Sequence, residues 1–305
     1  MNNQKSTEIE SIIERFKDNI ESEKHLVENL GLRPCFVLKK TEQSKVFSDL
    51  HHHDLYEILY IVSGKVSYSI DELHYELSDG DMVLISPTSL HRLDKVLSQK
   101  CERIVLTFSR NFLNYYSGLN SDLGKVFKDS KNNKSYLISF RNQDKKAIEN
   151  YLNNMYDLQF SNQYGADVMF NIRFMQTMLL INHKNQNSQT EIVVNKSNKI
   201  ISEVVDYIHS NLNKKILIKD IAEKMSLSES RLSHLFKEET GISILKFINK
   251  KRLMLSKELI RSGEHIGTIH TQCGFPDNTS FFRSFKKEYG ITPKTYYLNC
   301  KQSQD

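Results

Sequence analysis

The last third of the chain contains an internal repeat. FKEETGIS at 236–243 recurs as FKKEYGIT at 285–292, which is a shift of 49 residues. Each copy closes a longer unit, at 218–237 and 266–286, in which apolar residues at helical spacing stand on both sides of a short break. This spacing predicts a short helix, a tight turn and a second helix in each unit. The repeat therefore predicts an all-α C-terminal part with two helix-turn-helix units.

Two details of the repeat indicate how the units are built. Ser228 and Asp277 stand directly before the second helix of each unit, where their side chains can cap it. Between the units, 245–264 predicts a connecting helix of roughly 18 residues, about 27 Å long. Successive major-groove faces on one side of B-DNA are about 34 Å apart, so a helix of this length can serve two adjacent segments of the groove. The residues expected to face inward are Ile218, Ile221, Ala222, Leu227, Leu232, Leu235 and Phe236 in the first unit, and Ile266, Ile269, Phe275, Phe281 and Phe285 in the second.

The positive charge of the chain is concentrated in the same region. Residues 197–305 contain 18 Lys and Arg against 12 Asp and Glu, a net charge of +6, whereas the remainder of the chain has a net charge of −1. This asymmetry is typical of a near-neutral sensor or enzyme joined to a domain that binds a polyanion. Four single cysteines without CxxC spacing argue against a disulfide framework or a zinc cage and suit a reducing cytosol.

Over about 199–297 the sequence resembles the AraC/XylS transcription regulators. GFPDNTSFFRSFKKEYGITPKTYY carries the resemblance most closely, and SLSESRLSHLFKEETGIS is similar to the pattern of the first unit. The resemblance implies a cytoplasmic, sequence-specific regulator of transcription that binds double-stranded DNA as a homodimer and answers to a small-molecule effector. Activation, with RNA polymerase as a partner, is the commoner behaviour of the family.

The resemblance also implies which residues contact DNA. Arginines such as Arg231 and Arg283 can form bidentate hydrogen bonds with guanine, and lysines hold phosphates without reading sequence. His234 stands where arginine is frequent, which weakens the contact expected there. The alternative for each position is an exposed polar residue of a helix. The implied contacts are Ser230, Arg231, Ser233, His234 and Lys237 in the first unit and Asn278, Thr279, Ser280, Arg283, Lys286 and Lys287 in the second.

Residues 34–108 have a different pattern, with short runs rich in Val, Ile, Leu, Tyr and Phe between turn residues. Such runs predict a small barrel or sandwich. The spacing from His51 to Gly64 matches the first motif of the cupin β-barrel. The second motif is looser, because Thr88 stands where glycine is usual. A cupin-like sensor domain is common in the resembled family, so both lines of reasoning predict a cupin-like barrel here.

The motif HHHDLYE begins at His51. In one straight strand His51, His53 and Glu57 share a face. His52 would then point outside, and His91 can join the set from a neighbouring strand. Such residues can line an effector pocket, serve the structure alone, or ligate zinc, iron, nickel or manganese. A straight strand keeps His53 and Glu57 about 13 Å apart, too far for one ion unless it bends, so an effector pocket is expected and no metal cofactor is favoured.

Helical patterns surround the predicted barrel. Residues 1–30 predict an amphipathic extension, and 144–183 predict two helices that pack on the barrel or form a dimer interface. Residues 183–198 are polar, and 191–198 are assigned to a linker. The expected organisation is α+β and multidomain: the extension at 1–30, a sensor at 31–190 with its barrel at about 34–108, the linker, and a DNA-binding domain at 199–300.

Two other functions compete with a regulator. A metal-dependent cupin enzyme or metal sensor fused to a DNA-binding domain would use the histidines of the barrel for an ion. DNA alkyl-transfer repair would need a reactive cysteine in a basic or metal-bound cluster, and Cys101 has basic neighbours but no second cysteine near it in sequence. The longest apolar run, MVLI at 82–85, is far shorter than a membrane span. We therefore expect no enzyme activity and no membrane partner.

Overall fold

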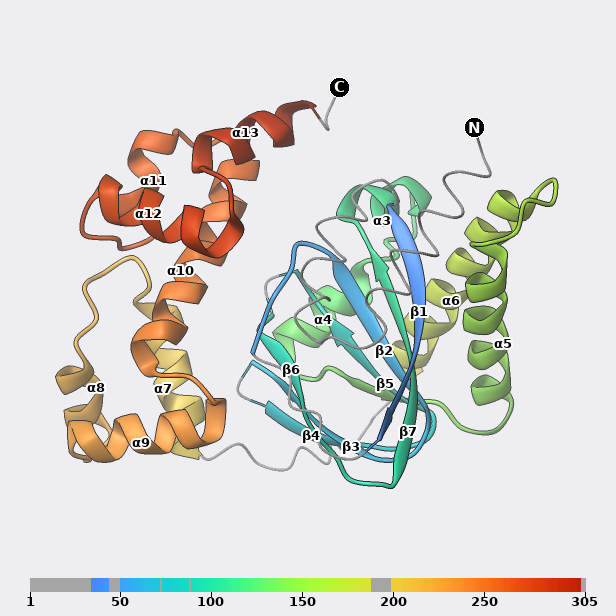
Figure 1. Cartoon of the computed structure of the whole chain (residues 1–305), viewed down its shortest axis with the longest axis horizontal. Coiled ribbons are helices and arrows are strands. Elements are labelled where there is room, and N and C mark those ends of the chain that lie inside the picture. Colours follow the sequence, from blue (N-terminus) through green and yellow to red (C-terminus); the bar gives the residue numbers. More distant parts are fainter. Residues whose placement is uncertain (1–33, 44–49, 72, 88, 188–198, 303–305) are drawn as a thin grey trace. The chain divides into compact units, whose positions relative to one another are not determined.

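The computed structural model describes residues 34–43, 50–71, 73–87, 89–187 and 199–302. The chain forms two compact units, Met1–Asn195 and Lys196–Asp305, drawn in Figure 1. The predicted N-terminal extension at 1–30, Thr88 and the linker assigned to 191–198 lie outside the described residues.

The N-terminal unit is built on two antiparallel sheets. One sheet has the strand order β1-β7-β2-β5-β8 and the other has the order β4-β3-β6. The larger sheet spans the middle of the unit in Figure 1. The strands are β1 (Cys35–Gln43), β2 (Tyr56–Ser63), β3 (Val66–Ile70), β4 (Leu73–Leu77), β5 (Asp81–Ile85), β6 (His91–Val96), β7 (Lys100–Phe108) and β8 (Leu137–Ser139).

Side chains of the larger sheet alternate between two cores, as the period of two along a strand requires. In β2, Tyr56 and Ile58 pack in the core shared with the helices. Leu59 and Ile61 pack in the barrel interior, the core between the two sheets. Glu57 has the same parity as Leu59, so its carboxylate points into the barrel interior.

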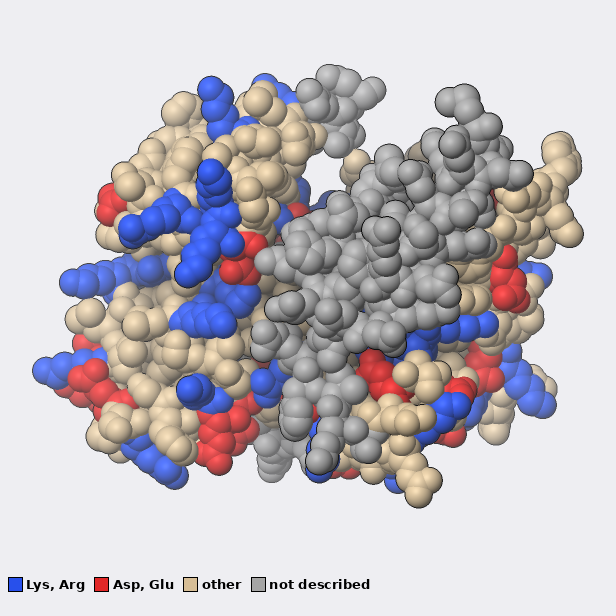
Figure 2. All heavy atoms as spheres, viewed as in Figure 1, with Lys and Arg blue, Asp and Glu red and all other residues tan. Residues whose placement is uncertain are grey.

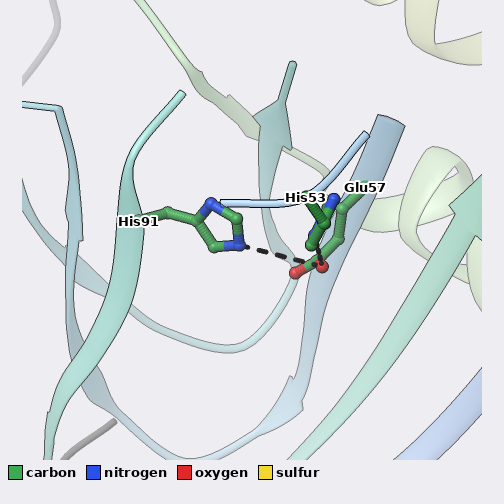
Figure 3. A group of neighbouring side chains, drawn as sticks. All are labelled: His53, Glu57 and His91. Atoms are coloured by element: carbon green, nitrogen blue, oxygen red, sulfur yellow. Dashed lines mark hydrogen bonds and ion pairs between the residues drawn. The ribbon is translucent and has the colours of Figure 1, made fainter. Parts of the chain in front are cut away.

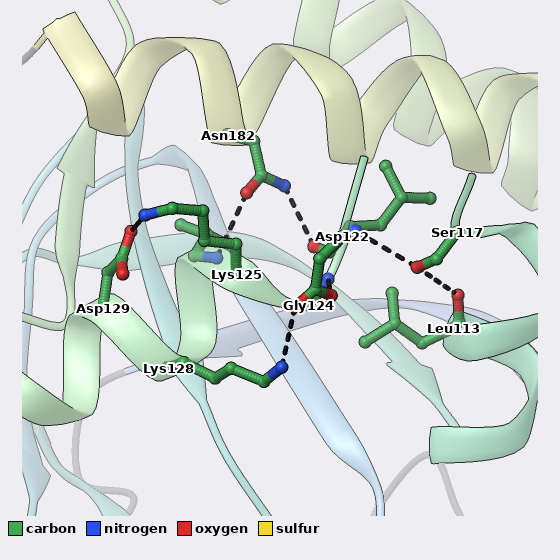
Figure 4. A network of polar contacts seen from close by, with 10 residues as sticks. Leu113, Ser117, Asp122, Gly124, Lys125, Lys128, Asp129 and Asn182 are labelled. Atoms are coloured by element: carbon green, nitrogen blue, oxygen red, sulfur yellow. Dashed lines mark hydrogen bonds and ion pairs between the residues drawn. The ribbon is translucent and has the colours of Figure 1, made fainter. Parts of the chain in front are cut away.

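Helices cover the outer face of the larger sheet. They are α3 (Arg110–Tyr116), α4 (Lys125–Asn132), α5 (Asn142–Leu158) and α6 (Ala166–Asn187). The segment from α3 to β8 was not anticipated from the sequence, and α6 continues to Asn187 instead of ending near 183. Asn182 of α6 ties α4 in place (Figure 4), because its side chain accepts a hydrogen bond from the Val126 N–H at 3.1 Å and donates one to the Leu123 carbonyl at 3.0 Å.

The C-terminal unit is all-α in its described residues, as predicted. Ser228 caps α9 by accepting from the Arg231 N–H, and Asp277 caps α12 by accepting from the Ser280 N–H, which confirms both predicted caps. Both helices end at a left-handed glycine, Gly241 and Gly290. The helices are α7 (Lys199–Ser210), α8 (Ile218–Lys224), α9 (Glu229–Thr240), α10 (Ile244–Arg261), α11 (Ile266–Gln272), α12 (Asn278–Tyr289) and α13 (Pro293–Gln302).

The two helix-turn-helix units share α10 as a common support. Phe247 of α10 packs edge-on against Phe236 of the first unit, with ring centroids 5.4 Å apart. Leu253 and Ile260, further along α10, pack with Phe281 and Phe285 of the second unit. The connecting helix therefore orients both second helices within one compact unit.

Candidate functional site

The second helix of the first unit, α9, exposes the residues implied to contact DNA. Leu232 and Phe236 bury the opposite side of the helix. The side chain of His234 lies 3.7 Å from the carboxylate of Glu238, one turn further along the exposed face. Ser230, Arg231, His234 and Lys237 are exposed and Ser233 is half-buried.

The second helix of the second unit, α12, has a similar exposed face. Its first turn is fixed by Asp277, which accepts hydrogen bonds from the N–H of Ser280 at 2.7 Å and from its hydroxyl at 3.0 Å. These bonds hold the pKa of Asp277 below its ordinary value. Phe282 is half-buried and packs edge-on against Phe281, with centroids 5.5 Å apart. Asn278, Thr279, Arg283, Lys286 and Lys287 are exposed and Ser280 is half-buried.

The two exposed helix faces differ in charge. The second unit has the stronger positive field, because α12 contains Arg283, Lys286 and Lys287 and only one acid, Glu288. That carboxylate is neutralised by Lys250 of α10, at an N–O distance of 2.6 Å. The first unit has more acidic residues in α9. Figure 2 shows lysine and arginine side chains spread over the face of the C-terminal unit that is in view.

Inside the barrel, His53, Glu57 and His91 come together (Figure 3). The Nε2 atom of His53 lies 2.9 Å from Oε2 of Glu57, and Nε2 of His91 lies 4.0 Å from the same oxygen. One potential ligand atom from each residue falls in a group whose members are all within 4.8 Å of one another. All three residues are buried. They form a compact polar group next to the mainly apolar side chains of the barrel interior.

Backbone carbonyls orient both imidazole rings of this group. Nδ1 of His53 lies 3.0 Å from the Leu55 carbonyl, and Nδ1 of His91 lies 3.1 Å from the Ser89 carbonyl. A carbonyl oxygen only accepts, so each Nδ1 is the protonated nitrogen. Burial and the neighbouring charge of His51 lower the pKa of His91 to about 3, so its ring is neutral and its Nε2 has a lone pair.

The local structure corrects the prediction based on strand parity. Strand β2 begins at Tyr56, so the histidine run lies before it and does not follow its alternation. His52, predicted to point outside, is buried. The chain bends between His53 and Glu57, which removes the separation expected for a straight strand. His51 instead pairs with His91 through two backbone hydrogen bonds of 3.1 and 2.9 Å, and their rings lie 4.3 Å apart.

The neighbours of Glu57 enclose the group. Ile85 of β5 and Thr107 of β7 lie directly opposite Glu57 in the register of the sheet. Tyr68 of β3 stacks on His91 with ring centroids 6.5 Å apart. Tyr68 and Tyr75 are both buried in the barrel interior.

A separate cavity lies in the helical layer of the same unit. Its volume is about 570 Å³, within the usual range for small-molecule sites. Residues of α3 and α6 contribute most of the wall, and the beginning of β1 closes one side. It was missed in the sequence because α3 was not predicted. The aromatic lining is Phe112, Tyr115, Tyr116 and Phe170, and the polar lining includes Gln159, Ser161, Asp167 and Asn171.

The fold and these sites define a ligand-controlled, DNA-binding regulator. Residues 36–136 match the family of the AraC-like ligand binding domain, and residues 221–298 match a helix-turn-helix domain family. Together the two matches cover more than half of the chain. The chain belongs to the AraC family of transcription regulators, which confirms the resemblance of the C-terminal repeat and the expected cupin-like and helix-turn-helix architecture.

The chain is also similar to several named proteins. The HTH-type transcriptional activator RhaS of Escherichia coli O139:H28 is 24% identical over 250 residues, which cover 80% of this chain and 85% of RhaS. The uncharacterized HTH-type transcriptional regulator YdeC of Bacillus subtilis is 24% identical over 266 residues, covering 86% and 90%. The crystal structure of ToxT from Vibrio cholerae O395 is 16% identical, with coverage of 87% and 97% and a TM-score of 0.35.

None of the helices in the described part of the chain is long and apolar enough to cross a membrane.

Proposed function

We propose that this protein is a cytoplasmic transcription activator that places α9 and α12 in adjacent major-groove segments of its operator. The observation that carries this proposal is the pair of capped, exposed, polar helix faces supported by one connecting helix. Helix α10 has 18 residues, or about 27 Å. Activation is supported by the relatives named as activators, and contact with RNA polymerase is a further part of the proposal. The protein acts through binding and has no catalytic role in this proposal.

Within this proposal α12 is the main anchor and α9 the weaker arm. Arg283 is exposed on α12 and can donate two hydrogen bonds to a guanine. On α9 the Glu238 carboxylate lies beside His234 and repels phosphate. Lys286 and Lys287 hold the phosphate backbone and add a salt-dependent part of the affinity.

A second copy of the chain is the proposed partner of α6. This helix buries Phe170, Phe174 and Met178 in its own unit. The opposite side has a stripe of apolar side chains spaced by four, three and four residues, as the seam between two packed helices requires. We call this stripe the α6 stripe: Val168, Ile172, Met175 and Leu179, of which Val168, Ile172 and Leu179 are exposed and Met175 is half-buried against the core of its own unit.

The effector is proposed to bind in the N-terminal unit, in the cavity of the helical layer. That cavity has the volume of a metabolite site, and its aromatic wall suits a ligand with an apolar or aromatic body. Phe170 and Asn171 of α6 form part of the cavity wall. An effector bound in the cavity would therefore contact the helix that carries the α6 stripe. A pocket formed by His51, His53, Glu57 and His91, as predicted from the sequence, stays a prediction.

Mobility-shift titration of the full chain tests the proposal. Duplexes selected for binding from a random library are titrated at two salt concentrations with the wild type and with Arg283→Ala. Lys100→Ala is the control, because it removes one positive charge from the barrel. We expect Arg283→Ala to weaken binding to the selected site by about 1–3 kcal/mol, with the control unchanged. Equal affinity for selected and random duplexes would contradict a sequence-specific regulator.

A further inference from the structure

The group inside the barrel has an electrostatic conflict. With Nδ1 of His53 donating to the Leu55 carbonyl, the other ring nitrogen of a neutral imidazole has a lone pair, and it lies 2.9 Å from a Glu57 oxygen. Two lone pairs at this distance repel unless a proton or a cation lies between them. The side chain of Glu57 is buried in the interior, so bulk water does not screen this repulsion.

The ring of His91 directs a third lone pair toward the same Glu57 oxygen. Its Nδ1 donates to the Ser89 carbonyl, and its Nε2 is buried and has no hydrogen-bond partner. That nitrogen faces the Glu57 carboxylate at 4.0 Å, as Figure 3 shows. Buried polar atoms are rarely left unmatched in folded proteins, so such an atom calls for a ligand, a water or an ion. A single cation would satisfy His53, Glu57 and His91 together.

The supporting contacts are those that metal-ligating histidines use. Such a histidine donates its second ring N–H to a carbonyl or carboxylate, which fixes the ring and makes the free nitrogen more basic. Both His53 and His91 have this arrangement, and the two carbonyls come from different segments, at Leu55 and Ser89. The two hydrogen bonds to carbonyl groups fix the rings, but they do not by themselves require both Nε2 atoms to face the Glu57 carboxylate. A shared metal ion would require this.

The distances suit one ion after a small closure. Nitrogen and carboxylate ligands lie about 2.0–2.2 Å from zinc, which puts tetrahedral ligands roughly 3.4 Å apart. The His53–Glu57 pair is closer than this at 2.9 Å, and the His91–Glu57 pair is wider at 4.0 Å. All three ligand atoms lie within 4.8 Å of one another, so the side chains would have to close slightly around one ion.

We propose that His53, Glu57 and His91 form a binding site for one divalent first-row transition cation inside the barrel. Two imidazoles and one carboxylate suit zinc and iron and disfavour calcium and magnesium, which take oxygen ligands. Three protein ligands leave at least one coordination position for water or another donor. This site lies apart from the helical-layer cavity and does not depend on the DNA-binding role.

Cobalt titration of the full chain tests the site. The protein is stripped with a chelator, and Co²⁺ is added while its visible absorption is recorded. We expect one equivalent per chain, displaced by Zn²⁺, which binds such sites more tightly. Glu57→Gln and His91→Asn should weaken binding by more than about a hundredfold, since losing a ligand exceeds the roughly 10–100-fold cost of losing a partner that only orients one.

Controls separate the site from adventitious binding and from misfolding. His183→Gln removes an exposed histidine of α6 in the same unit and should leave the titration unchanged. Far-UV circular dichroism checks the fold of each variant, and Zn²⁺ should raise the urea midpoint of the wild type but not of folded Glu57→Gln. Absence of stoichiometric Co²⁺ binding, or binding that folded Glu57→Gln and His91→Asn retain, would overturn the proposal. Mobility shifts with stripped protein show separately whether DNA binding persists.

Discussion

Gly274 lies directly against the carbonyl oxygen of Leu212, so close that a Cβ atom on Gly274 would be 2.2 Å from that oxygen. Gly274 is the residue with positive φ in the turn of the second helix-turn-helix unit, whereas Leu212 precedes the first unit. Arg252 of α10 donates to the same carbonyl at 3.0 Å and to the Lys214 carbonyl at 2.6 Å. The turn of one unit and the loop before the other are therefore held together on the connecting helix.

Replacing Gly274 should loosen the whole DNA-binding unit. Gly274→Ala adds both the strain of a left-handed backbone, about 1–3 kcal/mol, and a clash with the Leu212 carbonyl. Gly290→Ala is the matched control, because Gly290 has the same φ of +76° but no atom within 4 Å of its Cβ position. Hydrogen exchange by mass spectrometry should show much faster exchange in 199–302 for Gly274→Ala than for Gly290→Ala. Equal exchange in the two variants would mean that the contact with Leu212 does not hold the units together.

The side chain of Asn182 should be a stability determinant of the sensor unit. It links α6 to the beginning of α4 (Figure 4), and Asn182→Leu would leave the Val126 N–H and the Leu123 carbonyl without their bonds. We expect the free energy of unfolding to fall by about 1–3 kcal/mol. Urea denaturation followed by circular dichroism measures this in a chain without tryptophan. Asn154→Ala, which loses two hydrogen bonds to Asn150 within α5, is the control.

The outer face of the smaller sheet predicts a dependence of stability on pH. Burial alone raises the pKa of Asp94, but the nearby His74 ring, the hydrogen bond from Ser69 and the charge of Arg92 outweigh it and hold the pKa below its ordinary value. Ionised Asp94 therefore stabilises the fold above its unfolded-state pKa of about 3.9, and this contribution is lost as the pH falls through the lower folded-state pKa. Asp94→Asn should be less stable than the wild type at pH 7, with a gap that narrows below about pH 4. A gap that is independent of pH would contradict this assignment.

The α6 stripe predicts the oligomeric state. Ile172→Lys places a charge in the middle of the apolar stripe, where a second copy would have to desolvate it. We expect light scattering after size exclusion to show a dimer for the wild type and a monomer for Ile172→Lys. Asn162→Lys adds the same charge at an exposed position between α5 and α6 and should stay dimeric. A wild type that is monomeric at high concentration would remove the α6 stripe as an interface.

The DNA-binding unit was largely predictable because its signals are local. The repeat, the caps Ser228 and Asp277 and the apolar spacing all act within one or two helical turns, and the structure confirms the caps and most of the apolar positions. The exceptions are half-buried: Ile218, Leu227, Leu235 and Ile266. The additional contact of Gly274 with Leu212 was not visible, since the two residues are brought together only by the packing of α10.

The barrel site was only half predictable, for a physical reason. Strand alternation does not hold for His51, His52 and His53, because these residues precede β2 and a bend in the chain has no fixed period. The bend places His53 within 2.9 Å of Glu57 and buries His52. The pairing of β6 with β3 places His91 beside them. The cavity in the helical layer depends on α3, in a segment without a clear periodic pattern.

Selection of bound duplexes from a random library by the full-length protein tests the central claim most directly. Two recognition helices on one connecting helix predict enriched sites with two conserved blocks centred about 10 base pairs apart, one turn of B-DNA. Arg283→Ala should relax the preference in one block and leave the other. Enrichment of no sequence, or of a single block that Arg283→Ala leaves unchanged, would contradict a regulator that reads DNA with both α9 and α12.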